Sequence, residues 1–259
     1  MLTIENLTVS YTGHSILENL DLTIPEGSIT ALIGPNGCGK STLLKAISGG
    51  TKISSGKVYL NGQNLTKLGH KKRAKILSIL PQSPITPDGI SVQQLVSFGR
   101  NPYLSQWGKL NADDHQKVHS ALSETNLVAL AERTVDSLSG GQRQRAWIAM
   151  VLAQDTEYII LDEPTTYLDL SYQIELLEMM QKMNKKGKTI IVVLHDLNQA
   201  CRYCDHLVVM KKGQLIAQGD PLKIFNSQLL KDVFDLNAII INDPIANKPM
   251  CIPLQNNSK

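Results

Sequence analysis

The sequence is poor in aromatic residues and cysteine, and it contains no long apolar run. Aromatic residues make up 5% of the 259 residues, and there are four cysteines. Cysteines so scattered, in a chain without secretory features, argue against structural disulfides. No apolar stretch approaches the roughly 18 residues that a membrane-spanning helix needs. The formal net charge of +3 is too small to indicate nucleic-acid binding.

The N-terminal segment lacks the features of a targeting sequence. Met1–Asn6 contains neither a basic segment nor the apolar core of a signal peptide. We therefore expect a chain that stays in the cytosol and needs partner subunits for any work at a membrane. A chain of this length can bury up to ~75% of its unfolded surface, which suffices for one large domain.

A glycine-rich loop is the first sign of chemistry. Gly34–Ser41 reads Gly-Pro-Asn-Gly-Cys-Gly-Lys-Ser, between the apolar run Ile29–Ile33 and a helix-like segment. Glycines let backbone N–H groups converge on an anion, and the following helix points its positive end at the same place. Lys40 can supply charge to the β- and γ-phosphates, and the Ser41 hydroxyl can ligate Mg²⁺. The alternative, a glycine-rich turn before an ordinary helix, does not account for the Lys-Ser pair, so the loop predicts a nucleotide site.

An acidic pair follows a second buried run. Asp162 and Glu163 come directly after Tyr158–Leu161, which is typical of a buried strand. Beside a phosphate loop, Asp162 can hold Mg²⁺ directly or through water, and Glu163 can polarise the attacking water. The alternative is a helix cap or a solvated turn. The phosphate loop upstream favours the catalytic interpretation.

A second glycine motif precedes a helical pattern. Leu138–Gln142 reads Leu-Ser-Gly-Gly-Gln and is followed by the apolar segment Ala146–Leu152. Ser139 and the glycines would then lie at a helix N-terminus, where anions bind. Alone, this motif could be a simple helix cap.

The remaining pattern alternates strands with helices, which predicts a mostly parallel sheet covered on both faces. The expected strands are Leu2–Tyr11 and about 16–24, 57–61, 76–80, 158–161, 189–194, 207–210 and 214–217. The expected helices are about 91–96, 113–126, 171–186 and 227–234, with a loop over 102–111 that contains Trp107 and an extended end at 250–254.

Three further patterns are interpreted as structural or surface features rather than functional sites. Cys201 and Cys204 have redox spacing, but they lie within a predicted helix and are interpreted as packing residues. His115 and His119 could share a helix face, yet the intervening residues lack the glutamate of a zinc protease motif, so a solvated face is expected. The basic run Lys71–Lys75 is expected to be a wet helix face.

Taken together, the motifs resemble the ATP-binding subunit of ABC transporters over essentially the whole chain. Gly34–Ser41 matches the Walker A loop, Leu138–Gln142 the signature motif, and Leu161–Pro164 the end of Walker B. Gln82 matches the loop glutamine, Leu168-Asp169 the D-loop pair and His195 the switch histidine.

The resemblance implies an α/β P-loop NTPase core with a mostly parallel sheet, an N-terminal antiparallel β lobe and a helical lobe that carries the signature. We expect one domain, with core and β lobe at about 1–82 and 157–240, the helical lobe at about 83–156 and an extended tail at about 241–259. The implied catalytic residues are Glu163, His195 and Gln82, and the implied Mg²⁺ ligands are Ser41, Gln82 and Asp162. The implied ATP-binding residues are Tyr11, which would stack on adenine, Gly34, Pro35, Asn36, Gly37, Cys38, Gly39, Lys40, Ser41, Thr42, Ser139, Gly140, Gly141, Gln142 and Asp169.

The resemblance also implies partners. Two copies would close head-to-tail, so that Ser139 of one copy contacts the γ-phosphate bound by the other. Two integral membrane permease subunits would receive residues 82–111, and an extracellular or periplasmic binding protein would act indirectly. The expected location is the cytoplasmic face of the membrane, and no nucleic-acid partner is expected.

Several stretches resemble the importer branch that handles ferric siderophores, haem and cobalamin, and the closest similarity is to ferric-siderophore importers. These stretches are Val96–Pro102, Gly140–Trp147, Thr165–Asp169, His195–Ala200 and the tail Asp243–Pro253. The same motor role for haem or cobalamin remains an alternative, followed by a split exporter cassette and a soluble ABC ATPase. A degenerate regulatory protein is disfavoured because Lys40, Asp162, Glu163 and His195 are intact.

Overall fold

The computed structural model describes residues 1–104, 108–166 and 168–255, which form two compact units. The first unit consists of Met1–Leu68 and Gln181–Lys259, and the second of Gly69–Met180. Trp107, predicted in a loop, and Tyr167, within one importer-like stretch, lie outside the described residues. Among the described residues, we find no helix with the length and apolar character to cross a membrane.

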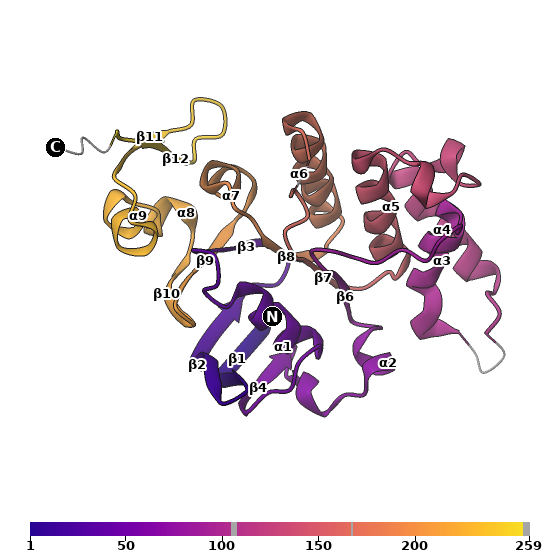
Figure 1. The fold of residues 1–259 in the computed structure, drawn as a ribbon, viewed down its shortest axis with the longest axis horizontal. Helices are drawn as coiled ribbons and strands as arrows, with labels where there is room; N and C mark the ends of the chain where they lie inside the picture. The colour runs from indigo at the N-terminus through magenta and orange to yellow at the C-terminus, as the bar shows by residue number, and fades with distance from the viewer. Residues whose placement is uncertain (105–107, 167, 256–259) are drawn as a thin grey trace. The chain divides into compact units, whose positions relative to one another are not determined.

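The first unit carries most of the strands (Figure 1). Its elements are β1 (Leu2–Tyr11), β2 (His14–Ile24), β3 (Ile29–Ile33), α1 (Lys40–Ser48), β4 (Ser55–Leu60), β5 (Gln63–Asn64), η1 (Leu65–Lys67), β8 (Thr189–Val193), α7 (Leu197–Tyr203), β9 (His206–Lys211), β10 (Gln214–Gly219), α8 (Pro221–Ile224), α9 (Ser227–Phe234), β11 (Ala238–Asn242) and β12 (Pro249–Pro253).

The N-terminal strands form the predicted antiparallel sheet, in the order β2-β1-β4-β5. In β1, Leu2, Ile4, Leu7 and Val9 are buried, while the residues between them are more exposed. Successive side chains of a strand point to opposite faces, so the alternation places one face of β1 in the core.

The strands around the phosphate loop are parallel and fully buried. β3 pairs in parallel with β8 on one side and with β9 on the other. Every residue of β3 and of β8 is buried, as expected for parallel strands covered on both faces. β10 pairs antiparallel with β9. The loop after β3 therefore starts from a fully buried strand that is paired on both sides.

The C-terminal segment is a hairpin rather than only an extended end. β11, which we did not predict, pairs antiparallel with β12. The hairpin is fastened to α7, because the Asn198 side chain donates to the Cys251 carbonyl (3.2 Å) and accepts from the Cys251 amide (2.8 Å). Arg202 in α7 also forms an ion pair with Asp243.

The two spaced cysteines of this region are packing residues, as predicted. Cys201 lies in α7 and Cys204 at its C-terminal end, and both are buried. Burial raises the pKa of the Cys201 thiol to about 12 and also raises the pKa of Cys204. Thiols held protonated in this way are poor nucleophiles and poor metal ligands.

The second unit is mainly helical, with one pair of parallel strands. Its elements are α2 (His70–Arg73), β6 (Leu77–Leu80), α3 (Val92–Ser97), η2 (Phe98–Tyr103), α4 (Ala112–Glu124), η3 (Val128–Leu130), η4 (Val135–Ser137), α5 (Gly140–Ala153), β7 (Tyr158–Leu161) and the start of α6 (Leu170–Lys185). β6 and β7 are parallel, and α3 and α4 pack against α5.

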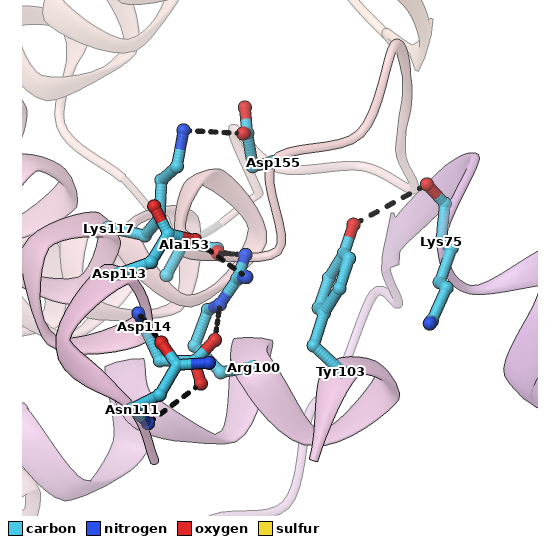
Figure 2. Close-up of polar contacts among 9 residues, drawn as sticks. All are labelled: Lys75, Arg100, Tyr103, Asn111, Asp113, Asp114, Lys117, Ala153 and Asp155. Carbon is cyan, nitrogen blue, oxygen red and sulfur yellow. Dashed lines mark hydrogen bonds and ion pairs between the residues drawn. The ribbon is translucent and has the colours of Figure 1, made fainter. Parts of the chain in front are cut away.

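The predicted loop at 102–111 is wrong at its start, because Pro102 and Tyr103 belong to the 3₁₀ helix η2. The buried guanidinium of Arg100 stabilises this segment (Figure 2). It donates to Asp114 Oδ1 and to the Ala153 carbonyl, each at 2.8 Å, and it stacks on the Tyr103 ring at 4.0 Å. One side chain thus joins η2, α4 and the end of α5.

Two surface predictions have different outcomes. His115 and His119 are exposed on α4, as expected, and the described residues contain no group of three or more His, Cys, Asp or Glu side chains arranged for a metal. The basic run is only partly a wet face, because Arg73 is buried while Lys71, Lys72 and Lys75 are exposed.

Candidate functional site

The phosphate loop connects β3 to α1, as the sequence predicts. Its glycines adopt left-handed or close-packed conformations that a side chain would prevent. At Gly34 (φ 153°), an added Cβ would lie 2.2 Å from the Met210 carbonyl oxygen. At Gly39 (φ 104°), it would lie 2.7 Å from a Leu17 methyl group. Gly39 is also the N-cap of α1 and has no side chain that could compete with an anion for the first amides.

Lys40 is folded back into this loop and is 6% exposed. Its ammonium donates to the carbonyl oxygens of Gly34 (2.7 Å) and Pro35 (3.0 Å). Cys38 is buried, its sulfur lies 3.8 Å from Lys40 Nζ, and its amide donates to the Pro35 carbonyl (3.3 Å). The loop therefore holds a buried cation beside the N-terminus of α1, an arrangement that suits phosphate.

Tyr11 ends β1 and remains available at the surface. Its side chain is 42% exposed, and its hydroxyl donates to Thr51 Oγ1 (2.8 Å). This hydrogen bond orients the ring without covering it. A held, exposed ring is the arrangement that stacking on a base requires.

The acidic pair and the loop glutamine meet in the second unit. The parallel register aligns Leu80 with Leu161, so Gln82 lies level with Glu163, each two residues further on. Gln82 Nε2 donates to Glu163 Oε2 at 2.6 Å. Glu163 has a left-handed backbone (φ 53°), which is rare for a residue with a side chain. Asp162 is 5% exposed. Residues with a strained backbone, such as Glu163, concentrate at functional sites.

The second glycine motif caps α5, as predicted. Ser139 Oγ accepts from the Gln142 amide (3.3 Å), and the Gln142 side chain accepts from the Ser139 amide (3.1 Å). This capping box fixes the first turn of the helix. Ser139 and Gly140 are nevertheless exposed, and an added Cβ at Gly140 would meet no atom within 4 Å. The positive end of α5 thus faces open space.

His195 follows β8 and is exposed. Asp196 caps α7 by accepting from the Gln199 amide (2.9 Å). Asp169 is exposed directly before α6.

Each unit assembles part of the predicted site. The first brings Lys40 next to Gly34 and Cys38 and also carries Tyr11 and His195, whereas the second joins Gln82 to Glu163 and carries Ser139. The sequence patterns assign no role to Gln144 or Tyr172. In the second unit, Gln144 donates to the Pro164 carbonyl and the Tyr172 ring packs on Gly141. Their partners are 20 and 31 residues away in the chain, so no local pattern marks them.

Three features define the class of ATP-binding cassettes. They are a phosphate loop between a buried strand and a helix, an acid pair after a parallel strand, and a capped glycine motif. The sequence profile described as ABC transporter matches residues 17–166. The chain therefore belongs to the ABC transporter family. This membership confirms the predicted fold class and the prediction of an ABC-transporter ATPase.

Similar proteins cover nearly the whole chain. The iron(3+)-hydroxamate import ATP-binding protein FhuC of Bacillus subtilis is 48% identical over 97% of this chain and 94% of its own length. The ferric enterobactin transport ATP-binding protein FepC of Escherichia coli is 46% identical over 96% and 93%.

Solved structures give the same picture. A metal-chelate type ABC transporter in an inward-facing conformation aligns with a TM-score of 0.85 at 29% identity, over 98% of this chain and 97% of its own. A dimeric ATP-binding cassette in a post-hydrolysis state with ADP and Pi aligns with a TM-score of 0.74 at 27% identity, over 85% and 98%.

Proposed function

We propose that this chain is the ATP-hydrolysing subunit of a membrane importer for ferric siderophores. The observation that carries the proposal is the near-equal identity, 48% and 46%, to ATP-binding proteins named for two different ferric siderophore systems. Both alignments cover more than nine-tenths of each chain, so the likeness extends beyond the nucleotide motifs.

The phosphate loop would bind the nucleotide. The convergent amides of Gly34–Thr42 would hold the α- and β-phosphates, and Lys40 would exchange its two loop carbonyls for the β- and γ-phosphates. The exposed ring of Tyr11 would stack on adenine.

The residues proposed as Mg²⁺ ligands come from both units, and each offers an oxygen atom, the kind of ligand that Mg²⁺ prefers. These are the Ser41 hydroxyl, the buried Asp162 carboxylate and the Gln82 amide oxygen. Because Gln82 Nε2 is engaged by Glu163, its Oε1 is the atom left to face a metal or a water. When bound, Mg²⁺ would neutralise charge on the β- and γ-phosphates.

Hydrolysis would depend on Glu163, with its carboxylate held by Gln82 while it takes a proton from the attacking water. His195 would contact the γ-phosphate. The exposed end of α5 would complete the site of a second copy, with Ser139 donating where other phosphate-loop enzymes use an arginine finger. Asp169 would lie at the same interface between copies. The exposed N-terminus of α5 supports this arrangement.

The importer would include two membrane permease subunits, which receive residues 82–111, and a separate substrate-binding protein. The chain would then act at the cytoplasmic face of the membrane. Cells that lack this chain should lose uptake of labelled ferric siderophores but retain haem and cobalamin uptake. The wild-type chain should restore that uptake, and Glu163→Gln should not. Intact uptake of ferric siderophores in the deletion strain would reject the substrate class, and loss of haem or cobalamin uptake would reassign it.

A further inference from the structure

Within one chain, the signature helix α5 is fastened to the segment that follows the acid pair. Gln144 Nε2 donates to the Pro164 carbonyl at 2.9 Å in a partly buried position. Pro164 is itself buried and directly follows Glu163. Because Gln144 lies in the first turns of α5, a shift of this end of the helix either moves the Pro164 carbonyl or breaks the hydrogen bond.

A second contact joins α5 to the start of α6. A Cβ added at Gly141 would lie 2.7 Å from Tyr172 Cδ1, so the Tyr172 ring rests directly on this signature glycine. The Arg145 guanidinium lies over the same ring, 5.7 Å from its centre, and Arg145 Nη1 is 3.0 Å from Glu175 Oε2. A movement of the first turn of α5 would therefore displace Tyr172, and with it the start of α6, to which Tyr172 belongs.

The contact is not tightly filled. Beside it lies a small pocket, whose lining includes Gly141, Gln144, Arg145, Tyr172 and Met179. Because protein interiors are otherwise close-packed, such a gap lowers the cost of a small relative shift of two helices. The α5–α6 contact is therefore less tightly packed beside Tyr172 than a filled core would be.

The contacts of Glu163 connect it to the segment that a shift of α5 would displace. Glu163 has a left-handed backbone at φ 53°, and its carboxylate accepts from Gln82 (2.6 Å) and from Thr166 Oγ1 (3.4 Å). The Thr166 amide also donates to the Glu163 carbonyl (3.2 Å). These hydrogen bonds hold Glu163 within the turn that also contains Pro164, so displacement of the Pro164 carbonyl is expected to change the direction of the Glu163 side chain.

We propose that Gln144 and Tyr172 are positioning residues that couple the two ATP sites of a dimer through each protomer. The inference rests on the proposed function, in which Glu163 serves the ATP of its own chain and Ser139 completes the site of the partner. Closure of the partner's site on Ser139 shifts the N-terminal end of α5. Gln144 and Tyr172 pass this shift to Pro164 and α6, and the Glu163 carboxylate takes up its working position. Occupancy of one site then favours hydrolysis at the other, which is positive cooperativity.

The test compares ATPase rates across MgATP concentrations for the full chain. Gln144→Met keeps a similar volume but removes the amide donor, and Tyr172→Leu removes the ring. Tyr172→Phe keeps the ring, and Glu178→Gln changes an exposed residue of the same helix, so both serve as matched controls. The wild type and the controls should show a Hill coefficient above 1. The Hill coefficient cannot exceed the number of sites, which is two in the proposed dimer. In the two test variants the Hill coefficient should fall to about 1. In Gln144→Met, kcat should also drop roughly three- to tenfold, as expected for one lost hydrogen bond.

A double mutant separates coupling from simple damage. Ser139→Ala removes the end point of the relay, so adding Gln144→Met should change kcat little further. Multiplicative losses, an unchanged Hill coefficient in Gln144→Met, or a wild-type coefficient of 1 would each overturn the coupling. If Tyr172→Leu does not fold, Gln144→Met decides alone. A wild-type chain that does not hydrolyse ATP would instead reject the proposed function.

Discussion

Gln82 Nε2 and Glu163 Oε2 lie 2.6 Å apart, although the two residues are 81 positions apart in the chain. The parallel register of β6 and β7 brings them level, and the left-handed backbone of Glu163 belongs to the same turn. The glutamine thus restrains the carboxylate before any water reaches it. A base held in place loses less entropy when it reacts, so this contact belongs to the proposed hydrolytic step.

Glu163→Gln should lower kcat by roughly 10²- to 10⁴-fold, because the amide cannot accept the proton of the attacking water. ATP binding should persist, and ATP-bound dimers should accumulate, which gel filtration with MgATP detects. Glu157→Gln, at an exposed position just before β7, is the matched control. Normal turnover in Glu163→Gln would mean that another group is the base.

Lys40→Ala should weaken ATP binding by roughly 100-fold, since charge-assisted hydrogen bonds to two phosphates are lost. Fluorescent nucleotide binding measures this effect directly, and uptake should fail in cells. The control is Lys45→Ala, at an exposed position of α1. Unchanged uptake with Lys40→Ala would remove this residue from the proposed site.

Ser139→Arg should act in trans if the second copy completes the site. The bulky cation would replace the hydroxyl that caps α5, at an exposed position where it meets the partner. When the variant is co-expressed with wild-type chains, uptake should fall further than the variant's share of chains. Ser120→Arg, exposed on α4, should have no such effect. A loss merely proportional to that share would argue for sites contained in one chain.

Much of this arrangement could be predicted because the residues that carry it are chemically constrained. β3 and β7 are fully buried runs, apolar except for Thr30, and each ends at its functional loop. The phosphate loop tolerates few residue types, so it can be recognised from the sequence. β11 was missed although Ile239–Ile241 favour a strand, because the strand is largely exposed and its partner strand begins and ends with proline.

Contacts between distant segments also escaped prediction. The bond from Gln144 to Pro164 and the packing of Tyr172 on Gly141 follow from how α5 and α6 meet, and no sequence period encodes that meeting. The role of Arg100 was hidden for the same reason: its partners lie on two other helices.

Arg100→Met should destabilise the protein by about 3–5 kcal/mol, because Asp114 would be left as a buried charge without its ion-pair partner. Hydrogen bonds from the Asn111 amide and from Arg100 outweigh burial, which by itself raises the pKa, and so the pKa of Asp114 is lowered. Denaturant unfolding measures the loss. Lys117→Met breaks a half-exposed pair with Asp155 (2.8 Å) and should cost at most about 1 kcal/mol. Both pairs are drawn in Figure 2. Equal effects would show that burial of the Arg100 pair is not decisive.

The attachment of the C-terminal hairpin should depend on pH through Asp243. The Arg202 guanidinium, helped by the amides of Ile245 and Ala246, lowers the pKa of Asp243 from 3.8 to about 2. Because the folded-state pKa is below the unfolded value, the stabilisation is complete above about pH 4. It is lost as the pH falls from there through about 2.

Arg202→Gln should therefore raise the pKa of Asp243 and shift the loss of the hairpin to higher pH. An NMR titration of the Asp243 carboxyl carbon, with amide exchange at Cys251 as a reporter of docking on α7, measures both effects. Lys231→Gln, which breaks the exposed pair with Asp235, should leave both unchanged. If the pKa of Asp243 stayed near its wild-type value in Arg202→Gln, the turn amides rather than the ion pair would hold the charge. The hairpin would then be fastened to α7 mainly through Asn198 and Cys251.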